Sequence, residues 1–162
     1  MMRWGITFRR FGGCAAVLVG FAAFGPALAA DGPFSGLGGS WGGSGTVKYS
    51  DGSTERMRCS ARYSGGGSDV SLSIKCNSAE RNIDVSGRLH ANEGHIGGSW
   101  NESNLGLSGS AVGKSSPGHL ALGLEGSVSG SMSVSFSESH QDVAIRVAGA
   151  TLESVNMSMG KR

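Results

Sequence analysis

Apolar and polar residues alternate along most of the chain after residue 30, and this alternation predicts β-strands. Every second residue is apolar between residues 57 and 63, and the same period resumes between residues 70 and 76 after the glycine-rich break "SGGGSD". Successive side chains of a strand point to opposite faces of a sheet, so each run has one buried and one exposed face. The two runs therefore predict an antiparallel hairpin.

The two-residue period recurs in further segments, at 83–89, 105–111, 120–124, 128–136 and 143–147, with shorter candidates at 45–49, 94–100 and 151–159. Helical spacing of apolar residues is not convincing anywhere after residue 30. We therefore predict an all-β fold, an antiparallel meander of about eight to ten strands forming a small barrel or a sandwich. Serines fill the outward face of 127–139, whereas the strands of an outer-membrane barrel turn apolar side chains to lipid. A domain that does not span a membrane is expected.

Residues 1–29 have the layout of a secretory signal peptide. Three arginines precede an apolar run that ends in Ala27-Leu28-Ala29. The apolar part, 12–24, is shorter than the roughly 20 residues that span a bilayer. We expect cleavage after Ala29, a single domain over 30–162, and export to the periplasm or beyond in a Gram-negative bacterium.

Removal of the leader changes the charge and the cysteine count. The whole chain carries a net charge of +2, and the leader holds three arginines, no acidic residue and one of the three cysteines. The mature chain is therefore close to −1, and nothing in its charge favours a nucleic-acid partner. Two cysteines remain, an even number that suits an oxidising compartment.

The hairpin register brings Cys59 and Cys76 together. If paired residue numbers sum to 135, Tyr63 faces Leu72 and Cys59 faces Cys76, with residues 66–69 as the loop. Directly opposed Cβ atoms lie about 4.5–5.5 Å apart, which is close to disulfide geometry. A redox pair normally has Cys-x-x-Cys spacing, and a zinc site needs four ligands. We favour a structural disulfide over these alternatives and expect no metal.

The same register turns Arg56, Arg58, Arg62 and Lys75 to the outer face of the hairpin. One interpretation is a surface that contacts an anionic ligand or partner. The other is an ordinary solvated face, with Lys75 beside Asp84 of the next strand, and charge runs favour this second interpretation.

Trp41 and Trp100 are the other candidate contacts, and Gly-Gly-Ser precedes each of them. They either plug the core of a protein that has few aromatic residues or line the mouth of a ligand site.

Catalytic and cofactor motifs are not evident. The four histidines, at 90, 95, 119 and 140, show no ligand-like grouping, and no Gly-x-Ser-x-Gly elbow joins a strand to a helix. Serine is so frequent that a Ser-His-Asp set carries little information. We expect a protein that is not an enzyme and needs no cofactor.

Several segments resemble a family of small, uncharacterised exported proteins of alphaproteobacteria. They include "SWGGSGTVKYSDGSTERMRCSARY", "LSIKCNSAERNIDVSGRL", "IGGSWNESNLGLSGSAVG" and "HQDVAIRVAGATLESVNMSM". The resemblance implies an exported β-rich domain with a disulfide and supplies no catalytic residues. Gly39-Ser40-Trp41 also resembles, more loosely, the Gly-x-Trp of calycins, the lipocalin and avidin-like barrels.

The leading expectation is an exported, non-enzymatic protein that binds a small apolar molecule or a component of the cell envelope. The alternative is a periplasmic inhibitor or accessory protein that acts by protein contact through an exposed segment such as 31–39. A hydrolase is the least favoured. An open interior of about 300–1,000 Å³ lined by Trp41, Trp100 and the leucines of 120–124 would favour the first.

Overall fold

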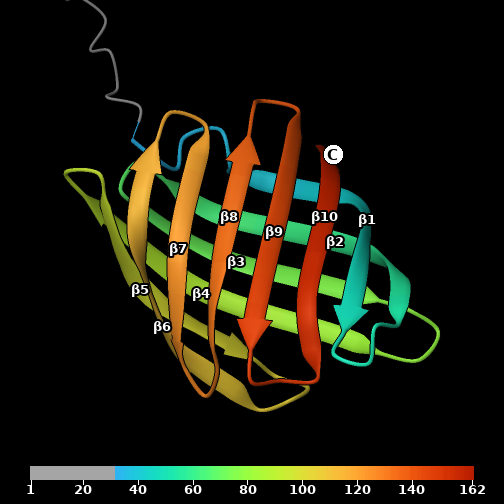
Figure 1. Ribbon diagram of the computed structural model, residues 1–162. Coiled ribbons are helices and arrows are strands. Elements are labelled where there is room, and N and C mark those ends of the chain that lie inside the picture. Colours follow the sequence, from blue (N-terminus) through green and yellow to red (C-terminus); the bar gives the residue numbers. More distant parts are fainter. Residues whose placement is uncertain (1–31) are drawn as a thin grey trace, which may run out of the picture.

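The computed structural model describes residues 32–162, which form ten antiparallel strands closed into a barrel (Figure 1). Each strand pairs with its neighbour in sequence, and β1 also pairs with β10 to close the ring. The predicted signal peptide, residues 1–29, lies outside the described residues. The strands are β1 (Gly39–Tyr49), β2 (Thr54–Gly66), β3 (Asp69–Asn77), β4 (Asn82–Asn92), β5 (His95–Glu102), β6 (Leu107–Ser116), β7 (His119–Gly126), β8 (Ser129–Phe136), β9 (His140–Ala148) and β10 (Leu152–Lys161).

The predicted all-β fold is confirmed, and of the two architectures the barrel is the one formed. Four predicted strand starts were too early, because Gly94, Leu105, Val128 and Thr151 lie in the connections between strands. At Leu105 the main-chain N–H donates to the Glu102 carboxylate, and Gly106 follows with a φ of 67°, so the chain reverses before β6 begins. Within residues 32–162 no helix is long and apolar enough to cross a membrane.

The β2–β3 hairpin has the predicted register. Tyr63 faces Leu72 and Cys59 faces Cys76. The loop is shorter than predicted, because Gly66 still pairs with Asp69 and only two residues turn the chain. Gly67 makes this turn possible with a φ of 64°, a conformation that glycine adopts without steric cost.

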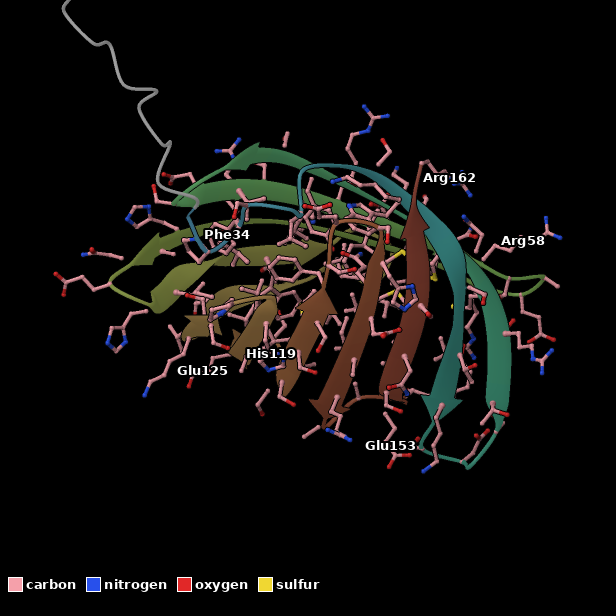
Figure 2. The ribbon with its side chains drawn as sticks, turned by 90° about the horizontal axis from the view of Figure 1, so that it is seen from above. Phe34, Arg58, His119, Glu125, Glu153 and Arg162 are labelled. Carbon is pink, nitrogen blue, oxygen red and sulfur yellow. A yellow bond between two sulfur atoms is a disulfide. The ribbon has the colours of Figure 1, made fainter. Side chains whose placement is uncertain are left out.

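One end of the barrel is filled by side chains. Residues 32–38 cross this end and bury Phe34 and Leu37 over the interior, and Figure 2 shows Phe34 there. Trp41, which is 1% exposed, packs below them and donates its Nε1–H to the carbonyl oxygen of Leu37 at 2.8 Å. The expectation of an exposed segment at 31–39 is therefore wrong for its large side chains, because burying them removes apolar area from water.

A polar pair lies within this closed end. Gln141 is fully buried, and its Nε2 donates to the Tyr63 hydroxyl at 3.1 Å. Burial raises the pKa of Tyr63 to about 12, because the phenolate would lose its hydration there.

The pKa of Tyr63 predicts a loss of stability at alkaline pH. In the unfolded chain tyrosine ionises near pH 10, whereas the folded state keeps Tyr63 neutral up to about pH 12. Its contribution is therefore complete below pH 10, and between pH 10 and 12 the free energy of unfolding should fall by about 1.4 kcal/mol per pH unit. Urea titrations across this pH range measure the slope in the wild type and in Tyr63→Phe. The variant should lack the part of the pH dependence that Tyr63 contributes. Equal slopes in the two proteins would contradict the assignment to Tyr63.

Candidate ligand cavity

The other end of the barrel encloses a cavity of about 640 Å³. Its walls are mainly aliphatic side chains from the inner faces of β3, β4 and β6 to β10. Among the residues that line it are Leu72, Ile83, Val85, Leu122, Leu124, Met132, Ile145 and Val155. It reaches the turns that join β3 to β4, β5 to β6, β7 to β8 and β9 to β10, and these turns form its mouth.

The barrel is hollow here partly because small residues occupy inward positions. Trp100 of β5 stands between Gly87 of β4 and Gly109 of β6, which have no side chains to compete with the indole. The indole Nε1–H donates to the carbonyl oxygen of Ser110 at 3.1 Å, which fixes the ring along the wall. Trp100 therefore shapes the cavity without filling it.

The mouth carries polar groups that the apolar walls lack. The Arg81 guanidinium lies 4.7 Å from the centre of the Tyr49 ring, and the Tyr49 hydroxyl donates to Glu55 Oε2 at 2.9 Å. Burial and this hydrogen bond raise the pKa of Tyr49. Asp51, Glu55 and Glu80 line a polar hollow beside the cavity together with Arg81. The rim thus has more acidic than basic groups, which disfavours a ligand with an anionic head at this place.

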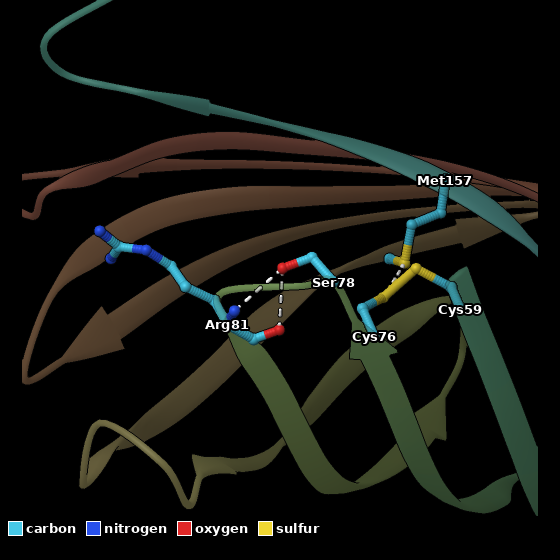
Figure 3. The surroundings of a disulfide bond; sticks show 5 residues. All are labelled: Cys59, Cys76, Ser78, Arg81 and Met157. Atoms are coloured by element: carbon cyan, nitrogen blue, oxygen red, sulfur yellow. Dashed lines mark hydrogen bonds between the residues drawn. A yellow bond between two sulfur atoms is a disulfide. The ribbon is translucent and has the colours of Figure 1, made fainter. Parts of the chain in front are cut away.

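Glu102 ties the start of β4 to the β5–β6 turn at the rim. It is 5% exposed, and its two carboxylate oxygens accept hydrogen bonds from the main-chain N–H groups of Asp84, at 3.0 Å, and Leu105. The β3–β4 turn is tied internally as well, because Ser78 Oγ accepts from Arg81 N at 2.9 Å and donates to Arg81 O at 3.1 Å (Figure 3). Because both of its carboxylate oxygens accept main-chain hydrogen bonds, Glu102 fixes the backbone at the mouth of the cavity.

The structure brings together some of the predicted contacts and separates others. Trp100, Leu122 and Leu124 line the cavity, whereas Trp41 and Leu120 are packed in the core. Sequence reasoning missed Arg81 and Tyr49, and it gave Glu102 no role because nothing in the sequence marks that carboxylate as buried. No local pattern shows that the ends of β1 and β5 and the β3–β4 turn meet at one rim.

The four predicted basic contacts lie on the outside of the barrel, away from the cavity. Arg56, Arg58, Arg62 and Lys75 are all exposed. Lys75 Nζ lies 2.8 Å from Asp84 Oδ2, as the register predicts.

The disulfide between Cys59 and Cys76 is present and buried (Figure 3). Met157 Sδ lies 3.4 Å from Cys76 Sγ, and since neither cysteine keeps a thiol proton this is a packing contact. Within residues 32–162 no group of three or more histidine, cysteine and acidic side chains is arranged to hold a metal ion.

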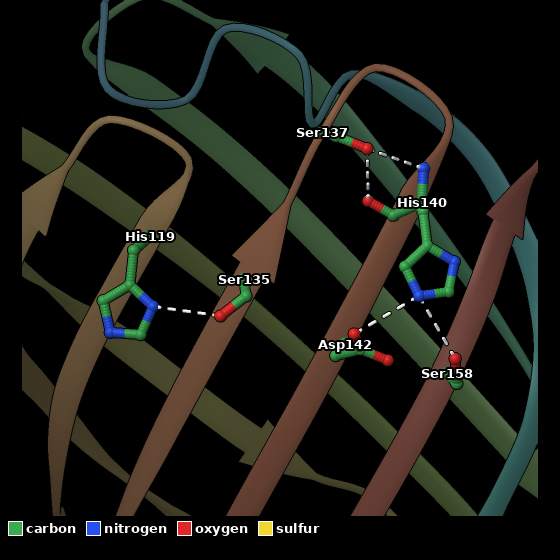
Figure 4. Close-up of polar contacts among 6 residues, drawn as sticks. All are labelled: His119, Ser135, Ser137, His140, Asp142 and Ser158. Carbon is green, nitrogen blue, oxygen red and sulfur yellow. Dashed lines mark hydrogen bonds and ion pairs between the residues drawn. The ribbon is translucent and has the colours of Figure 1, made fainter.

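Among residues 32–162, neither His119 nor His140 forms a catalytic triad with the polar neighbours drawn in Figure 4. At His140, both Asp142 and Ser158 approach the same ring nitrogen, Nε2, at 3.2 and 3.4 Å. A Ser-His-Asp relay needs the serine and the aspartate on different nitrogens of the ring. His119 contacts only Ser135 among the residues drawn, through Nδ1 at 3.1 Å.

Comparisons with known proteins identify the fold. No family model matches the chain, and the search of curated proteins found no match. Among solved structures it is similar to the crystal structure of Rv2717c from M. tuberculosis, with a TM-score of 0.62 and 15% identity over 79% of this chain and 94% of that one. It is also similar to the S-type phycobiliprotein lyase CPES from Guillardia theta, with a TM-score of 0.52 and 12% identity over 80% of this chain and 89% of that one. The chain has a calycin-like barrel fold. The resemblance to exported alphaproteobacterial proteins stays a prediction.

Proposed function

We propose that this protein is an exported, non-enzymatic carrier that holds one small apolar molecule in the barrel. The observation that carries this proposal is the cavity, whose 640 Å³ falls within the roughly 300–1,000 Å³ of typical ligand pockets. Its aliphatic walls suit a hydrocarbon or aromatic body.

The difference in packing between the two ends of the barrel supports a binding role for the cavity. At the closed end, large side chains fill the interior of the barrel: Phe34, Leu37 and Trp41 are each at most 1% exposed. Side chains that face a void lose dispersion contacts. A ligand of matching shape would restore those contacts, which favours binding.

Export is supported by the disulfide, because such bonds persist mainly in oxidising compartments. The alternative of an inhibitor acting through residues 31–39 is less favoured, because Phe34 and Leu37 are buried and cannot meet a partner.

A neutral apolar fluorophore, N-phenyl-1-naphthylamine, tests the proposal. Its fluorescence should rise on titration with the protein and saturate at one equivalent. Leu124→Trp should weaken this binding at least tenfold, because the added ring extends from a position between Ala111 and Gly130 into the cavity. Val112→Trp is the matched control, since Val112 lies on the outer wall and is 52% exposed.

Two results would contradict a cavity binder. One is a wild-type protein that gives no saturable signal. The other is a folded Leu124→Trp variant that binds the fluorophore as tightly as Val112→Trp, which would place the fluorophore on the surface.

A further inference from the structure

Three arginines lie on the outer wall of the barrel at positions that surround Ser60 of β2. Arg58 and Arg62 lie two residues before and after Ser60. The side chains of Arg58, Ser60 and Arg62 therefore leave β2 on its outward face. Arg162 joins them across the β1–β2 pair, because its guanidinium lies over Gly42, the β1 residue that pairs with Ser60. We call Arg58, Arg62 and Arg162 the arginine cluster.

Gly42 makes the position of Arg162 possible. A Cβ atom at residue 42 would collide with the Arg162 guanidinium, so any other residue would displace it. The main chain is held as well, since Arg162 N donates to the carbonyl oxygen of Ser40 at 2.9 Å. Figure 2 shows Arg58 and Arg162 on the same side of the barrel, both pointing outward.

No acidic side chain pairs with the arginine cluster within the described part of the chain. Lys75, the neighbour of Ser60 on β3, is neutralised by Asp84 at 2.8 Å. None of the three arginines forms a salt bridge with an aspartate or glutamate side chain among residues 32–162, although the mature chain is nearly neutral. Like charges side by side repel one another, and a bound anion would relieve that repulsion.

We infer that the arginine cluster binds a phosphate monoester or free phosphate. A guanidinium donates two parallel hydrogen bonds to a pair of oxygens, and three guanidinium groups suit an anion with more than two oxygens. A carboxylate has only two. A phosphate monoester also carries a charge of about −1.5 to −2 at neutral pH, which matches the three cations. The Ser60 hydroxyl adds a neutral donor at the centre.

The experiment separates the two sources of this phosphate chemistry. Flotation with phosphatidylcholine vesicles that contain phosphatidic acid probes a lipid headgroup, and inorganic phosphate, read as a rise in thermal midpoint, probes the free ion. We expect binding in at least one arm. Arg58→Gln/Arg62→Gln should weaken it tenfold or more, because hydrogen bonds between ionised groups are stronger than those that a neutral amide makes.

The matched control is Lys114→Gln/Arg146→Gln, which removes the same charge from outward positions on β6 and β9. It should change binding less than twofold. An equal loss in both variants, equal binding to phosphatidylserine vesicles of the same total charge, or no binding in either arm would overturn the inference. Fluorophore binding in the cavity should be unchanged in Arg58→Gln/Arg62→Gln, so this inference and the proposed carrier function fail independently.

Discussion

Replacing both Cys59 and Cys76 by alanine is expected to lower the free energy of unfolding by about 3 kcal/mol. The disulfide closes a loop with a sequence separation of 17 residues. In the chain-entropy description, a cross-link that closes a loop near this length stabilises the folded state by about 3 kcal/mol, because it reduces the entropy of the unfolded chain. Domains of this size are usually stable by only about 5–15 kcal/mol, so the loss is a large fraction. Equilibrium unfolding in guanidinium chloride measures it.

Met157→Leu is the control for the packing around the disulfide. It removes the sulfur that lies 3.4 Å from Cys76 Sγ and keeps both the cross-link and a side chain of similar volume. We expect it to cost less than about 1.5 kcal/mol. A double alanine variant that unfolds at the wild-type midpoint would show that the disulfide contributes little to stability.

Gly109→Ala should destabilise the barrel by about 3 kcal/mol, the upper end of the usual cost of overpacking. Gly109 of β6 pairs with Gly126 of β7, and the two backbones approach closely there. A Cβ at residue 109 would overlap the carbonyl oxygen of Glu125 and lie 3.0 Å from Gly126 Cα. Because both obstacles are main-chain atoms, the strands would have to move apart.

Gly97→Ala is the matched control on the neighbouring strand. Gly97 lies on β5, and a Cβ there would meet no atom within 4 Å. Alanine at this position should leave the urea midpoint unchanged or raise it slightly, because it reduces the freedom of the unfolded chain. If both variants had the same midpoint, the close approach of β6 and β7 would not be limiting.

The candidate site was only partly predictable. Trp100 was identified by its Gly-Gly-Ser context together with Trp41, yet only Trp100 lines the cavity. The difference arises because Trp41 stands near the start of β1, at the closed end, whereas Trp100 stands near the end of β5, at the mouth. The local sequence context is the same for both residues, and they differ only in their position along the barrel axis.

The arginine cluster shows the same limit. The register of the hairpin placed Arg58 and Arg62 on one outward face, but Arg162 is 100 residues or more away in sequence. It reaches them because β10 pairs with β1, with Lys161 opposite Trp41.

The sequence by itself determined the strands, the inward and outward faces, the register of the β2–β3 hairpin and the Cys59–Cys76 pair. These follow from a two-residue period and from pairing across one short turn, which are local properties of the chain. Only the tertiary structure decided that the strands close into a barrel, that one end is filled and the other hollow, and which distant residues meet. Those outcomes depend on the pairing of β1 with β10, whose energy comes from contacts between chain ends that no local pattern encodes.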